Sequence, residues 1–123
     1  MGAEDVEVAS RFRVALEAVA KTGAREALYP FLAPDVEWVT PQRRLIGINA
    51  VKEELTWGSP PEALDIDFDL GDWKDLGDGR LVSDVHEVYR MKETGDFAYE
   101  RDRRIELTIR DGKISRYEMQ IIG

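Results

Sequence analysis

The fold is decided by residues 81–121, which read LVSDVHEVYRMKETGDFAYERDRRIELTIRDGKISRYEMQI. Apolar and polar side chains alternate along this stretch, and the alternation is interrupted within residues 92–96 and again near Asp111 and Gly112. A period of two is typical of strands with one buried face, so the stretch predicts two consecutive β-hairpins. The odd-numbered positions form the more apolar set and are expected to face the core.

A turn within residues 92–96 determines which residues of the first hairpin oppose each other. The expected pairs are Tyr89 with Tyr99, Glu87 with Arg101, and Val85 with Arg103. One carboxylate and two guanidinium groups then share a face that is otherwise largely apolar. Isolated charges are costly to bury, so these groups must pair with each other or line a wet cavity.

For the second hairpin, the sequence favours a three-residue loop with Gly112 in the left-handed conformation. This register pairs Ile109 with Lys113, Leu107 with Ser115, Ile105 with Tyr117, and Arg103 with Met119. A two-residue turn would instead direct Arg116, Glu118 and Gln120 inward, so the hydrophobic pattern selects the longer loop.

The preceding residues predict helices and short strands. Helical spacing of apolar side chains is seen in residues 4–22 and 24–32, the second helix being bent or ended by Pro30. A strand is expected at 35–40, a loop with Arg43 and Arg44 at 42–47, a helix at 48–57, and a strand at 64–70 with its aspartates in solvent. This order predicts an α+β fold in which about three helices cover the concave face of a curved antiparallel sheet.

Length and composition narrow the class of protein. The 123 residues fit one domain, 1–123, with 43% hydrophobic and 34% charged residues. A net charge of -8 argues against nucleic-acid or anionic-membrane partners. Cysteine is absent, which excludes disulfides and a thiolate nucleophile and suits the cytoplasm. We expect no metal or other cofactor, no export signal and no membrane span.

Three short segments carry a resemblance to a known family. They are residues 31–38 (FLAPDVEW), residues 46–51 (IGINAV) and residues 111–114 (DGKI). In this order and spacing the chain resembles the nuclear-transport-factor-2-like (NTF2-like) superfamily, in particular its SnoaL-like, polyketide-cyclase-like branch. The resemblance implies a cone-shaped domain with a cavity between sheet and helices, and frequent homodimers that pack through the outer face of the sheet.

The resemblance also allows known active sites to be compared position by position. The three groups used by steroid-isomerase-like members fall at Phe12, Thr40 and Ile105, so all three are missing here. Of the groups used by limonene-epoxide-hydrolase-like members, only the acid at Glu87 remains. Cyclase-like members use an aspartate–histidine pair in the cavity, whereas the single histidine, His86, has outward parity and is expected opposite Asp102.

The inward charged residues leave three interpretations open. Glu87, Arg101 and Arg103 form a structural ion-pair cluster, or the arginines bind an anionic ligand, or Glu87 acts as a general acid or base because burial raises its pKa. The candidate pocket lining is Trp38, Tyr89, Tyr99, Tyr117 and Met119, which equally suit a core.

We therefore predict a cytoplasmic, dimeric protein that binds a small molecule, anionic or aromatic, in a partly apolar cavity. The alternatives are a metal-independent acid–base enzyme using Glu87, such as an isomerase, cyclase or hydrolase, and a noncatalytic dimerisation or protein-interaction module. Whether the protein is an enzyme stays open at this point.

Overall fold

The computed structural model describes residues 2–22, 25–54 and 64–122. The elements, in chain order, are α1 (Gly2–Thr22), the 3₁₀ helix η1 (Arg25–Phe31), β1 (Leu32–Val39), β2 (Arg44–Ile46), α2 (Ile48–Glu54), β3 (Leu64–Leu70), β4 (Lys74–Gly77), β5 (Arg80–Met91), β6 (Phe97–Arg110) and β7 (Lys113–Ile121).

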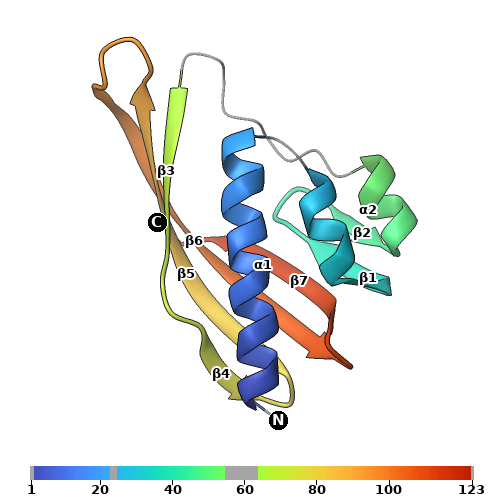
Figure 1. Ribbon diagram of the computed structural model, residues 1–123. Coiled ribbons are helices and arrows are strands. Elements are labelled where there is room, and N and C mark those ends of the chain that lie inside the picture. The colour runs from blue at the N-terminus through green and yellow to red at the C-terminus, as the bar shows by residue number, and fades with distance from the viewer. Residues whose placement is uncertain (1, 23–24, 55–63, 123) are drawn as a thin grey trace.

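The strands form one curved sheet in the order β2-β1-β7-β6-β5-β3, with β4 also paired to β5. Helix α1 crosses one face of the sheet, which we call the inner face, and the turn end of the β5–β6 hairpin extends past the end of α1 (Figure 1). The predicted α+β class with helices over one face is confirmed. The sheet is mixed rather than purely antiparallel, because β1 runs parallel to β7.

Helix α1 forms as its sequence predicts. Glu4 and Asp5 lie in its first turn, where the helix dipole favours negative charge, and Glu7 pairs with Arg11 one turn later at 2.7 Å. Its buried face meets the inward side chains of the sheet, and η1 and α2 add Leu28 and Val51 to the same core. The buried residues of α1 are Ala9, Phe12, Ala15, Leu16 and Val19.

The predicted register of the first hairpin is confirmed. The structure pairs Tyr89 with Tyr99, Glu87 with Arg101, and Val85 with Arg103. In the turn, the Met91 N–H donates to the Asp96 carbonyl and the Gly95 N–H donates to the Met91 carbonyl, both at 2.8 Å. The odd-numbered residues of β5 up to Tyr89 are buried, as the alternation indicates.

The predicted register of the second hairpin is wrong. The turn has two residues, Asp111 and Gly112, which take φ angles of 53° and 74° and therefore both lie in the left-handed region. Arg110 pairs with Lys113, and a bulge after the Ile109–Ile114 pair shifts the later pairs. These later pairs are Leu107 with Tyr117, Ile105 with Met119, and Arg103 with Ile121. The bulge returns Tyr117 and Met119 to the inner face, so the predicted facing is correct although the opposite partners are not.

The other differences concern short elements. The expected loop at 42–47 contains strand β2, which is antiparallel to β1. Strand β4 was not expected, because its four residues are all exposed and carry no alternation. The second helix is of the 3₁₀ type and ends at Phe31, one residue after Pro30. The third helix begins at Ile48 as predicted, and its expected continuation from 55 to 57 lies outside the described residues.

Candidate functional site

Glu87 is a buried carboxyl group on the inner face of the sheet, with only 6% of its surface exposed. Its backbone opposes Arg101, yet its ion-pair partner is the diagonal neighbour, Arg103, whose Nε lies 2.6 Å from Glu87 Oε1. The Arg103 side chain is 23% exposed. The structure thus brings the three predicted charged residues together, but it divides them into one close pair and one further guanidinium group.

The electrostatics of Glu87 are dominated by burial. Desolvation raises the pKa of its carboxyl group above the ordinary value, and the positive charges of Arg103 and then Arg101 act in the opposite direction. Both Glu87 Oε1 and Arg103 Nε are fully buried without a well-directed hydrogen bond from the described residues, so the short contact is an ion pair rather than a hydrogen bond. The site is therefore a close, buried ion pair in which desolvation of the carboxyl outweighs the charges of the two guanidinium groups.

Two tyrosines adjoin the charged residues on the inner face. Tyr89 and Tyr99 stack across β5 and β6 with ring centroids 4.3 Å apart and an interplanar angle of 15°. Tyr89 is buried and Tyr99 is 39% exposed. The guanidinium carbon of Arg101 lies 5.7 Å from the centroid of the Tyr99 ring, within range of a cation–π contact. This end of the cluster is therefore aromatic, cationic and open to solvent.

The other predicted lining residues divide between cluster and core. Trp38 stacks on Tyr117 at 3.8 Å, Phe12 meets Tyr117 edge to face at 6.2 Å, and all three side chains are almost fully buried. Burial also raises the pKa of Tyr117. Met119 reaches the charged residues, since its sulfur lies 3.9 Å from Arg103 Nη1. Tyr117 lies near enough to Arg103 and Glu87 for their charges to act on it, and both Trp38 and Tyr117 belong to the packed core.

The opposite, outer face of the sheet carries charge pairs, as the parity of the strands predicts. His86 Nδ1 lies 2.6 Å from Asp102 Oδ1 and its Nε2 lies 3.1 Å from Glu100 Oε2, while Arg104 bonds Asp84 at 2.8 Å. The hydrogen bond to Asp102 raises the pKa of His86. The outward orientation of His86 is confirmed.

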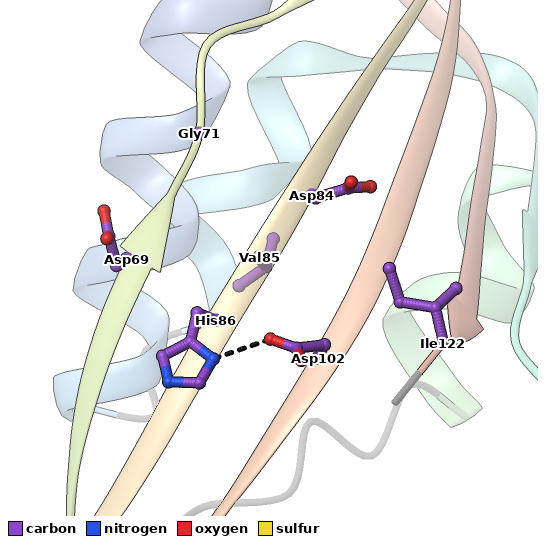
Figure 2. A pocket seen from close by; sticks show the side chains of 7 residues that line it. All are labelled: Asp69, Gly71, Asp84, Val85, His86, Asp102 and Ile122. Carbon is purple, nitrogen blue, oxygen red and sulfur yellow. Dashed lines mark hydrogen bonds and ion pairs between the residues drawn. The ribbon is translucent and has the colours of Figure 1, made fainter.

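Sequence reasoning missed a hollow of about 340 Å³ on this outer face (Figure 2). Its charged wall comes from three adjacent strands, and the register that places Asp69 opposite His86 was the signal that could have revealed it. The lining residues are Asp69, Gly71, Asp84, Val85, His86, Asp102 and Ile122.

Other candidate groups lie apart from the inner cluster. Asp65, Asp67 and Asp69 are exposed on β3, and nowhere in the described residues do three acidic or histidine side chains gather as a metal site. Arg44 is exposed and pairs with Glu37 at 2.7 Å, on the side of β1 opposite to Trp38. In the described ranges, no helix combines the length and apolar character that crossing a membrane requires.

The fold is that of NTF2-like proteins, as comparison with solved structures shows. An NTF2-like protein from Anabaena variabilis superposes with a TM-score of 0.75 at 16% identity, over 98% of this chain and 91% of the other. TerC, co-crystallised with polyporic acid, gives 0.67 at 23% identity, over 97% and 92%. A Mesorhizobium loti protein described as a SnoaL-like polyketide cyclase gives 0.58 at 18%, over 91% and 97%. No protein-family model and no curated protein sequence matches the chain.

Proposed function

We propose that this chain is a small-molecule-binding protein whose site is the inner-face cluster of Glu87, Arg101, Arg103, Tyr89 and Tyr99. The observation that carries the proposal is the buried Glu87 carboxyl, which lies beside a stack of the buried Tyr89 and the solvent-exposed Tyr99. Such a site combines apolar contact area with a few converging polar groups, as ligand sites generally do. Met119 and Tyr117 border this cluster, and Trp38 stacks on Tyr117 in the core.

The solved structures of the same fold are compatible with this proposal. TerC was crystallised with polyporic acid, an organic small molecule. Other structures of this fold are described as a polyketide cyclase and, from Rhodopseudomonas palustris, as an isomerase. Fold alone does not transfer an activity, so the proposal depends on the cluster itself.

Catalysis by Glu87 is the second candidate, favoured by the direction of its pKa. A carboxyl whose pKa is raised towards working pH is suited to general acid–base chemistry without a metal. If a bound compound is converted, Glu87→Gln should abolish turnover while retaining binding, because the amide keeps the shape but cannot exchange the proton. Unchanged turnover in a folded Glu87→Gln variant would exclude this role.

Binding itself is tested by nuclear magnetic resonance on the ¹⁵N-labelled protein. The test panel consists of aromatic acids, amides and alcohols with one or two rings. We expect some of these compounds to shift the amide resonances of residues 87–89 and 99–103. Arg104→Gln, on the outer face of β6, is the matched control and should leave these shifts unchanged. If the whole panel leaves the inner-face amides unmoved, the proposal is wrong.

The same proposal includes a homodimer in the cytoplasm, joined through the outer face of the sheet. Its support is the dense set of charge pairs there, including Arg80 with Glu106 and Arg90 with Asp67, which a second copy could complement. Sedimentation equilibrium should give twice the chain mass of 14.0 kDa, with weaker association at high salt because exposed charges are screened. A species of single-chain mass throughout would contradict the dimer.

A further inference from the structure

The charges of the inner-face cluster do not cancel. Glu87 contributes one negative charge, and Arg101 and Arg103 contribute two positive charges. The close contact of 2.6 Å commits the Glu87 carboxylate to Arg103. In the described parts of the chain, no carboxylate lies within 4.0 Å of the Arg101 guanidinium, although Glu87 directly opposes Arg101 in the strand register. With Glu87 ionised, the cluster carries one uncompensated positive charge, located on Arg101.

Arg101 is held in a position from which it can recognise a ligand. Its guanidinium lies over the Tyr99 ring, and Tyr99 is in turn stacked on the buried Tyr89. Tyr89 covers one face of the Tyr99 ring and the Arg101 guanidinium lies over the ring as well, so the partly exposed Tyr99 offers a ligand its ring edge beside the cation. A guanidinium group binds a carboxylate through two parallel hydrogen bonds, and aromatic rings favour stacked or edge-on partners.

We propose that the ligand of this site is a planar monoanion, such as an aromatic monocarboxylate, whose acid group pairs with Arg101 while its ring packs against Tyr99. This rests on the proposed function, because it specifies the ligand of the same site. Arg103 is already neutralised by its ion pair with Glu87. A single negative charge on the ligand makes the occupied cluster neutral, whereas a cation or a dianion leaves a net charge in a partly buried site.

The experiment compares 2-naphthoate with its neutral analogue 2-naphthamide and with cyclohexanecarboxylate, which keeps the charge and lacks the aromatic ring. Amide shifts of the ¹⁵N-labelled protein report both the location and the dissociation constant. We expect 2-naphthoate to bind at residues 99–103, and both analogues to bind more weakly. Loss of a charge-assisted pair should weaken 2-naphthoate about ten-fold or more in Arg101→Gln.

Arg104→Gln removes a guanidinium from the outer face of the same strand and is the matched control, expected to bind 2-naphthoate like the wild type. Equal binding of 2-naphthamide and 2-naphthoate at the inner face would leave the proposed function standing and overturn the monoanion proposal. The same holds if Arg101→Gln, shown to be folded by its amide dispersion, binds 2-naphthoate unchanged. If the three probes and the wider panel all fail to move any inner-face amide, both proposals are wrong.

Discussion

Replacing Arg103 with methionine should destabilise the protein in a manner that depends on pH. The variant leaves the Glu87 carboxylate buried without its partner 2.6 Å away, which either costs a buried charge or forces the carboxyl to take up a proton. Protonation sets the upper limit, because holding a carboxyl of ordinary pKa 4.5 neutral costs about 1.4 kcal/mol per pH unit above that value. This limit is about 5 kcal/mol near pH 8 and about 1.4 kcal/mol near pH 5.5.

The wild type already pays part of this cost, since burial raises the Glu87 pKa even with Arg103 present. Because Arg103 is also partly exposed, we expect Arg103→Met to lose about 2–3 kcal/mol near pH 8 and about 1 kcal/mol or less near pH 5.5. The sign follows because the pKa of Glu87 is higher in the folded state than in the unfolded state. Protonated Glu87 therefore contributes stability at pH values below its unfolded pKa, and this contribution is lost as the pH rises through the folded pKa. For 123 residues, the larger loss corresponds to a Tm lower by about 8–12 °C.

The assay is urea unfolding followed by circular dichroism at both pH values, the lower of which stays above the sequence pI of about 4.7. Arg104→Met is the control, because its exposed pair with Asp84 should be worth about 1 kcal/mol or less at either pH. Adding Glu87→Gln to Arg103→Met should remove the pH dependence of the loss. A loss that is equal at both pH values, or no greater than that of Arg104→Met, would refute the reasoning.

Three further outcomes can be measured by the same unfolding assay. Because the pKa of His86 is raised, its contribution to stability is complete below its ordinary pKa of 6.5 and is lost as the pH rises through the folded pKa. His86→Gln should abolish this dependence of the unfolding free energy on pH. An unchanged pH dependence would show that it does not come from His86. Gly79→Ala should cost well over 1 kcal/mol, because its Cβ would clash with the backbone oxygen of Ile109. Gly95→Ala is also at positive φ but meets no neighbouring atom, and it should cost about 1 kcal/mol. Equal effects of the two glycine changes would show that the close approach is relieved. Ser83→Ala should cost about 1–2 kcal/mol by removing a buried hydrogen bond of 2.7 Å to a backbone carbonyl, and no loss would indicate that the carbonyl finds another donor.

The success of the first hairpin and the failure of the second have one physical cause. Alternation reports which face a side chain occupies, and it holds along β5 and for Ile105, Leu107 and Ile109 of β6 because the core fixes those inward positions. Alternation does not report where an extra residue is inserted. The inward facing of Tyr117 needs one insertion after Gly112, and the chain places it in β7 as a bulge rather than in the turn, where Asp111 also adopts a positive φ.

Contacts between distant segments were also beyond the sequence pattern. The parallel pairing of β1 with β7 joins Trp38 to Tyr117 across most of the chain, and no local periodicity encodes it. At the candidate site, the register correctly placed Glu87 opposite Arg101, but the choice of Arg103 as the ion-pair partner depends on side-chain reach along the diagonal. The residues of the cluster were therefore predictable, whereas their division into a committed pair and a separate cation was not.

That division bears on the three interpretations that the sequence left open. Burial raises the pKa of Glu87 although the charges of Arg103 and Arg101 act to lower it, so the ion pair does not fully offset the desolvation of the carboxyl group. A neutral side chain at this position would therefore serve folding better at neutral pH, as replacements of buried ion pairs by apolar groups often do. In the stabilising interpretation Arg101 acts on Glu87 only through its charge at a distance, because it opposes the carboxylate and yet has no ion pair among the described residues. The proposed ligand binding would account for both observations, because it would use the cation that folding leaves unpaired and would give the buried carboxyl a task beyond stability.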